Sequence, residues 1–248
     1  MALPYHSFIS WNLFGLEIQA YGVMVAIAVI VATIIAVHEA KRKKENPEHI
    51  YNIVFWLVIT ALIVSRITHI LIYPESYSSF WEMLMVWKGG LAWYGAFFGG
   101  VLGTFLYAKL HKINFWKFAD IIAPGIPIGH IFGRIGCILG DGGHVGKLTS
   151  MPWGVYVNGE LRHLTALYSI IGLVIVSIIV WKLRKKNKFD GFVFASYVML
   201  YAVMRNIVEL FRADPTWFGL TMAQWSTIIL FVVFGIFMWI GLKRKNSY

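Results

Sequence analysis

Long apolar stretches separated by short polar connections recur along the whole chain. Seven stretches of 18 to 24 mostly apolar residues cover positions 18–37, 50–73, 90–110, 118–139, 166–183, 192–211 and 224–242. A helix needs about 20 such residues to cross a hydrocarbon core about 30 Å thick. The pattern therefore predicts an all-α integral membrane protein with seven transmembrane helices.

The fourth stretch carries two prolines, Pro124 and Pro127. Proline lacks the backbone N–H that continues a helical ladder, and its ring crowds the preceding turn. We therefore expect the fourth membrane segment to be kinked or partly unwound.

Basic residues are concentrated in alternate connections. The first, third and fifth connections and the C-terminal tail carry 15 lysines and arginines, against 4 in the remaining connections. Short cytoplasmic loops of membrane proteins are enriched in these residues. The distribution predicts an N-terminus outside and a C-terminus in the cytoplasm.

The longest polar stretch, residues 140–165, lies on the predicted outer side. It contains several turn-forming glycines and a short strand-like run, Val155–Val157. We expect it to form a small outer cap. Because the sequence has no internal repeat and no long polar linker, residues 1–248 are expected to form a single membrane domain that includes this cap.

Composition supports the membrane assignment. The 248 residues are 58% hydrophobic and only 14% charged, with a mean hydropathy of +0.67. The net charge of +10 does not indicate nucleic acid, because the basic residues lie at the ends of apolar stretches rather than on one face. The single cysteine, Cys137, excludes an internal disulfide and a multi-cysteine metal site.

Three arginines fall inside predicted membrane segments: Arg66, Arg134 and Arg205. Intramembrane charges are costly and are functional candidates by default. Glu209 follows Arg205 by four residues, so the two can form a structural ion pair, and Arg66 can instead extend to the membrane surface. The predicted topology places all three arginines toward the outer leaflet, where guanidinium groups suit a phospholipid phosphate.

Several ordered motifs resemble those of one family. They include Ala-Tyr-Gly at residues 20–22, a glycine-rich run at 89–100, Gly-Arg-Ile-Gly-Cys at 133–137, His-Leu-Thr-Ala-Leu-Tyr at 163–168, Arg-x-x-x-Glu-x-x-Arg at 205–212 and Leu-Thr-Met-Ala-Gln at 220–224. The chain resembles the prolipoprotein diacylglyceryl transferases, integral membrane enzymes of bacteria. The resemblance extends over most of the chain.

The resemblance implies an activity, a location and a set of partners. Members transfer the diacylglyceryl group of phosphatidylglycerol to the lipobox cysteine thiol of preprolipoproteins and release glycerol 1-phosphate. The expected partners are phosphatidylglycerol, lipobox peptides and membrane lipid, without nucleic acid, metal or cofactor. The expected location is the bacterial cytoplasmic (inner) membrane, with several membrane passes and the site facing the outer leaflet.

The resemblance also suggests roles for individual residues. A leaving phosphate needs positive charge as its C–O bond breaks. Arg134 and Arg205 are therefore expected to act on the donor phosphate. Substrate binding is expected to involve these two arginines together with Arg66, Arg212, Glu209, Tyr21 and His163.

The proton acceptor for the thiol is less well defined by the sequence. Tyr94 stands where many members carry a histidine, and Asp141 is expected to replace an acid missing from the family signature. His144 and His163 are weaker candidates for the same role. Cys137 stands where members commonly carry asparagine, and we interpret it as a small packing residue rather than a nucleophile.

Two other functions remain open at this point. The departures at Tyr94, Cys137 and Asp141 are compatible with a divergent homologue that modifies another acceptor or only binds phospholipid. A transporter is less favoured, because the halves show no repeat and the intramembrane arginines lie on one side.

Overall fold

A computed structural model describes residues 10–13, 16–86, 89–140, 145–186 and 188–246. Its contacts divide the chain into two compact units. The first unit combines Met1–Ala36 with Ala119–Tyr248, and the second is Val37–Phe118. The single membrane domain expected over residues 1–248 therefore stays a prediction.

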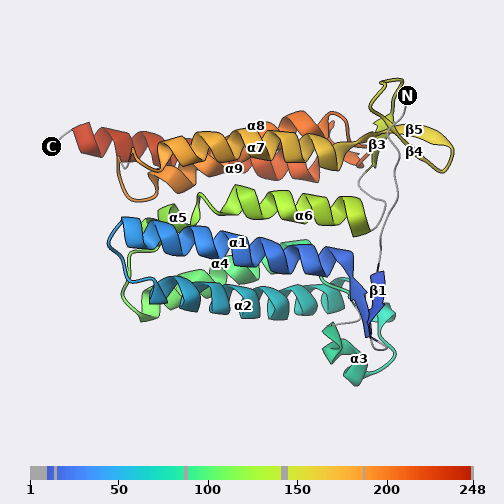
Figure 1. The fold of residues 1–248 in the computed structure, drawn as a ribbon, viewed down its shortest axis with the longest axis horizontal. Coiled ribbons are helices and arrows are strands. Elements are labelled where there is room, and N and C mark those ends of the chain that lie inside the picture. Colours follow the sequence, from blue (N-terminus) through green and yellow to red (C-terminus); the bar gives the residue numbers. More distant parts are fainter. Residues whose placement is uncertain (1–9, 14–15, 87–88, 141–144, 187, 247–248) are drawn as a thin grey trace. The chain divides into compact units, whose positions relative to one another are not determined.

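The described chain is mostly helical, with short strands near the helix ends (Figure 1). In chain order the elements are β1 (Ser10–Leu13), β2 (Leu16–Gln19), α1 (Ala20–Arg42), α2 (Glu48–Ile72), the 3-10 helix η1 (Pro74–Ser76), α3 (Phe80–Leu84), α4 (Trp93–Leu110), α5 (Phe115–Ile122), α6 (Ile126–Gly140), β3 (Val145–Leu148), β4 (Val155–Val157), β5 (Glu160–Leu164), α7 (Thr165–Leu183), α8 (Phe192–Glu209), β6 (Thr216–Trp217), β7 (Leu220–Thr221) and α9 (Met222–Asn246).

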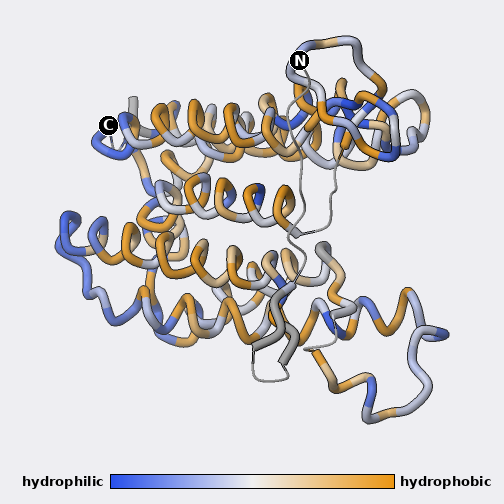
Figure 2. Tube along the Cα trace, turned by 45° about the vertical axis from the view of Figure 1, so that its right-hand side comes forward, coloured by the Kyte–Doolittle hydropathy of each residue, from blue (hydrophilic) through white to orange (hydrophobic). Residues whose placement is uncertain are grey.

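Several helices are long and apolar enough to cross a membrane. Five qualify in the described part of the chain, namely α1, α2, α7, α8 and α9, and the bent pair of α5 and α6 is a sixth candidate. Apolar residues run along the helices and hydrophilic residues gather at several helix ends (Figure 2). The chain is therefore an integral membrane protein with several membrane passes. The remaining predicted segment, residues 90–110, corresponds to α4.

The predicted distortion of the fourth segment is confirmed. Helix α5 ends at Ile122, α6 begins at Ile126, and the two axes differ by 52°. Pro127 is the second residue of α6, a position where the missing N–H costs no helical hydrogen bond. The second proline, Pro124, lies in the break itself.

Glycines bring α2 and α4 into close contact in the second unit. A Cβ atom built at Gly95 would lie 2.7 Å from the Ser65 Cα, and one at Gly99 would lie 2.5 Å from the Thr60 carbonyl oxygen. These distances leave no room for a side chain. The two glycines are four residues apart on one helix face, which is the small-residue spacing that lets membrane helices approach closely.

The first unit uses the same packing between α1 and α6. A Cβ at Gly125, the residue just before α6, would lie 2.8 Å from the Ala32 carbonyl oxygen, and one at Gly136 within α6 would lie 3.0 Å from the Met24 Cβ. The neighbouring Cys137 is buried, as a small packing residue would be. This contact places the arginine-bearing helix α6 directly against α1.

Asp120 holds the start of α8. Its buried carboxylate accepts hydrogen bonds from the backbone nitrogens of Gly191 and Phe194, each at 2.9 Å. The first N–H groups of a helix have no partner within the helix, and the helix dipole favours a negative charge there. A residue distant in sequence thus caps the helix that carries Arg205.

We expect Asp120→Ala to lower stability by about 2 kcal/mol, since it removes two charged hydrogen bonds from a buried helix end. For a chain of this size, that loss corresponds to a fall of about 4–8 °C in melting temperature. The melting temperature is measured in detergent with a thiol-reactive dye, which reacts with the buried Cys137 thiol as heating exposes it. Asp120→Asn retains one acceptor oxygen and should therefore lose less stability than Asp120→Ala. Equal stability of the alanine variant and the parent would contradict the capping role of Asp120.

A three-stranded antiparallel sheet, ordered β3-β5-β4, lies within the stretch expected to form the cap. The strand predicted at residues 155–157 is present as β4. Strand β3 is joined to the end of α8, because the Lys147 backbone nitrogen donates to the Phe211 carbonyl at 2.9 Å. The two hairpins β1–β2 and β6–β7 were not expected from the sequence.

Candidate active site

A buried cluster of charged side chains lies at the C-terminal end of α8 in the first unit. The Glu209 carboxylate is fully buried, and its Oε2 lies 2.8 Å from Arg205 Nη2 and 3.6 Å from Arg212 Nε. Its other oxygen accepts a hydrogen bond from the Thr221 hydroxyl at 2.9 Å. The ion pair expected between Arg205 and Glu209 is thus present, but it does not use the whole guanidinium. Arg205 Nη1 is buried and has no hydrogen-bond partner among the described residues.

Arg212 lies between two carboxylates. Its Nε donates to Asp214 Oδ2 at 2.8 Å, and Glu209 lies on its other side. Partial burial raises the pKa of Asp214, but the hydrogen bond and positive charge of Arg212 outweigh it, so the pKa is lower than usual. Asp214 is therefore ionised at neutral pH and balances Arg212.

Arg134 faces the same cluster from α6. It is partly exposed, and no hydrogen bond or ion pair joins it to any residue that the structure describes. The positive charges of Arg134 and Arg212 both act on the Arg205 guanidinium. Counting Glu209 and Asp214 against these three arginines leaves one positive charge in excess among the described residues. An anion is the ligand that such an excess favours.

A histidine and two tyrosines extend this polar face along the helices. His130 precedes Arg134 by one helical turn, and its Nδ1 lies 3.2 Å from the Tyr197 hydroxyl. Its ring also lies 5.5 Å from that of Tyr201, one turn before Arg205. We did not single out these three residues from the sequence. His130 and Tyr201 each precede an arginine by four residues, and Tyr197 precedes Arg205 by eight; this helical spacing was the available signal.

Two other predicted site residues also belong to the first unit. The His163 ring packs against Phe211, and its Nδ1 lies 2.8 Å from the Tyr168 hydroxyl, so it borders the end of α8. Tyr21 is the second residue of α1 and is about half exposed, with its Cβ 3.3 Å from the position of a Cβ built at Gly140. Both lie close to elements that carry the arginines.

The second unit holds Arg66 and Tyr94. The Arg66 guanidinium is buried and donates only to backbone carbonyls, including those of Met83 at 2.8 Å and Glu82 at 2.7 Å. Tyr94 is the second residue of α4 and its side chain is half exposed. Asp141 and His144 lie outside the described residues.

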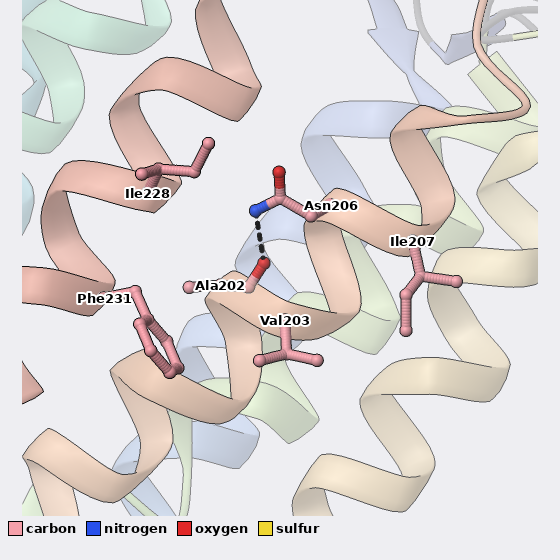
Figure 3. A pocket seen from close by; sticks show the side chains of 6 residues that line it. All are labelled: Ala202, Val203, Asn206, Ile207, Ile228 and Phe231. Carbon is pink, nitrogen blue, oxygen red and sulfur yellow. Dashed lines mark hydrogen bonds between the residues drawn. The ribbon is translucent and has the colours of Figure 1, made fainter. Parts of the chain in front are cut away.

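A hollow of about 290 Å³ between α8 and α9 does not offer a head-group site (Figure 3). Its lining is apolar apart from Asn206, and the amide nitrogen of Asn206 already donates to the Ala202 carbonyl and the Thr227 hydroxyl, each at 2.8 Å. The arginine cluster is therefore the better candidate for recognition of an anion.

Comparison with known proteins identifies the family of the chain. A sequence profile described as prolipoprotein diacylglyceryl transferase matches residues 9–240. The chain belongs to the prolipoprotein diacylglyceryl transferase family. Among similar family members, the phosphatidylglycerol–prolipoprotein diacylglyceryl transferase of Clostridioides difficile is 34% identical over 241 residues, covering 96% of each chain. The enzyme of the same description from Campylobacter lari is 32% identical over 260 residues, covering 96% of this chain and 95% of the relative.

Family membership confirms the assignment made from the motifs. Both Arg134 and the Arg205–Arg212 run lie inside the matched region, as do the departures at Tyr94 and Cys137. The family match therefore covers every described residue of the candidate site.

Proposed function

We propose that this chain transfers the diacylglyceryl group of phosphatidylglycerol to the lipobox cysteine thiol of preprolipoproteins, with release of glycerol 1-phosphate. The observation that carries this proposal is the unpaired, buried Nη1 of Arg205 beside Arg134, in a chain that matches family members over 96% of its length. An intramembrane site with surplus positive charge fits a phospholipid head group.

The reaction joins sulfur to carbon. The acceptor thiolate attacks the glyceryl carbon that carries the phosphate, an S–C bond forms and the C–O bond breaks. The electron pair of that bond leaves on the phosphate oxygen of glycerol 1-phosphate, and the thiol proton passes to a base. Negative charge builds on the leaving oxygen, so cations positioned beforehand lower the barrier.

Arg134 and Arg205 are the proposed partners of the donor phosphate. Arg134 has no described partner to give up, and Arg205 contributes its free Nη1 while Nη2 stays with Glu209. Glu209 holds Arg205 in place and is itself flanked by Arg212, and Tyr21 and His163 border the substrate. Tyr94 and Asp141 are the two proposed acceptors of the thiol proton.

The proposed topology has seven spans, with α4 as the third and the bent pair of α5 and α6 as the fourth. The N-terminus is outside and the C-terminus is cytoplasmic, as the distribution of basic residues predicts. In this proposal the enzyme lies in the bacterial inner membrane, and its arginine cluster and cap face the outer leaflet.

Release of glycerol 1-phosphate tests the proposal. The purified protein is placed in nanodiscs containing phosphatidylglycerol and assayed with and without a lipobox peptide. We expect release that depends on the peptide and none with phosphatidylethanolamine as the only lipid. No release in the presence of the peptide would overturn the proposal, and release without modification of the peptide would instead support transfer to another acceptor.

A further inference from the structure

The segment that connects α2 to α4 is built around one arginine. It comprises residues 73–86 with Gly89 and Gly90, and is called the connecting segment below. All five N–H groups of the Arg66 guanidinium donate to backbone carbonyl oxygens of the connecting segment. Nε donates to Met83, Nη1 donates to Gly89 and Gly90, and Nη2 donates to Glu82 and Met85, over distances of 2.5 to 3.3 Å.

This arrangement leaves Arg66 no N–H group for a substrate phosphate. The guanidinium also lies over the Tyr77 ring, 4.7 Å from its centroid. Gly90 is required beside it, because its φ is +72° and an added Cβ would lie 2.7 Å from Arg66 Nη1. Arg66 is therefore a positioning residue for the connecting segment.

The hydrogen bonds of Arg66 fix the position of the connecting segment along α2. Arg66 lies six residues before Ile72, the last residue of α2, or about 9 Å along the helix axis. Helix α2 has 25 residues, more than the roughly 20 needed to cross the hydrocarbon core. Since Arg66 binds the segment's backbone directly, the segment is held beside the last turns of α2.

Hydrogen bonds within the segment keep it ordered. The Ser79 hydroxyl oxygen accepts from the Glu82 backbone nitrogen and caps the short helix α3. The Glu82 carboxylate in turn accepts from the backbone and hydroxyl of Ser78. The Tyr77 hydroxyl lies 2.7 Å from His69 Nδ1 on α2, which is a second tie to that helix.

The ordered segment presents large apolar side chains outward. Phe80 is 68% exposed, Trp81 is 70% exposed and Leu84 is 52% exposed, all on α3. Aromatic side chains of this kind favour the boundary between lipid and water. We propose that α3 is a lipid-contacting plate, in which these three side chains enter the head-group layer where α2 leaves the bilayer, and that Arg66 holds the plate there.

Site-specific fluorescence tests the plate. In a Cys137→Ala background, which leaves no other thiol, a cysteine replaces Trp81 and carries an environment-sensitive fluorophore. A matched protein carries the label at Glu75, an exposed polar position in the same segment. In nanodiscs we expect the label at position 81 to be quenched at least about twofold more by lipids spin-labelled near the head group than by an aqueous quencher. The label at position 75 should show the reverse order.

A second variant tests the role of Arg66. Arg66→Lys keeps the charge but loses the five-donor fork, so lipid quenching at position 81 should fall to the level seen at position 75. The control Arg162→Lys changes an arginine of the cap and should leave lipid quenching at position 81 unchanged. The plate is overturned if the aqueous quencher reaches positions 81 and 75 equally in protein that retains Arg66. The positioning role is overturned if Arg66→Lys leaves lipid quenching intact. Neither readout depends on the proposed reaction.

Discussion

Replacing Arg134 with alanine is expected to lower the rate of diacylglyceryl transfer by about 100- to 1,000-fold, the usual effect of removing one positioned charge-stabilising donor. The melting temperature should change little, because no described residue pairs with Arg134. Rates of glycerol 1-phosphate release and thermal exposure of Cys137, measured on the same preparation, separate the two effects.

The matched control is Arg244→Ala, which removes an exposed arginine from the last turns of α9. It should keep the parent rate. If Arg134→Ala also kept that rate, Arg134 would have no role in the chemistry. If it lost activity only in proportion to lost stability, its role would be structural.

Replacing Glu209 with glutamine is expected to destabilise the protein by roughly 3–5 kcal/mol, the usual cost of removing one partner from a buried ion pair. The amide is nearly the same size and keeps an oxygen for the Thr221 hydroxyl, so packing is preserved. The loss of stability therefore reports the cost of leaving the Arg205 charge uncompensated. Thermal melting in detergent measures this loss.

Glu160→Gln provides the comparison. Glu160 pairs with Arg162 on the cap, where the two side chains are 52% and 30% exposed. Exposed pairs contribute at most about 1 kcal/mol. Equal losses for the two glutamine variants would show that burial of the Glu209 pair contributes nothing to stability.

Much of the helical architecture could be predicted from hydropathy alone. Apolar length is a direct consequence of bilayer thickness, so the helices follow from the seven stretches. The break at Pro124 was also predictable, because proline acts on the backbone locally. Helix α1 instead continues through Arg42, beyond the predicted end at position 37, because a buried Glu39 pairs with Arg42 in its last turn.

Contacts between distant residues were not predictable in the same way. The sequence does not reveal that Asp120 caps a helix 71 residues later, or that Arg66 is occupied by carbonyls up to 24 residues away. Such pairings depend on how the chain folds back on itself. Periodicity reports only which residues share a helix face.

The candidate site was predicted in part. The pairing of Arg205 with Glu209 follows from their spacing, and motif resemblance identified Arg134. The sequence pattern did not reveal that Arg205 keeps one nitrogen unpaired. The sequence also placed Arg66 among the residues expected to bind substrate, whereas its guanidinium donates to backbone carbonyls.

The mass of a lipobox peptide after incubation tests the central claim most directly. The purified protein receives phosphatidylglycerol labelled with a heavy isotope in its diacylglyceryl glycerol, together with the peptide or its Cys→Ser analogue. The account predicts that the cysteine peptide gains one labelled diacylglyceryl group in a thioether that resists mild base, and that the serine peptide gains nothing. An unmodified cysteine peptide, or equal modification of both peptides, would contradict it.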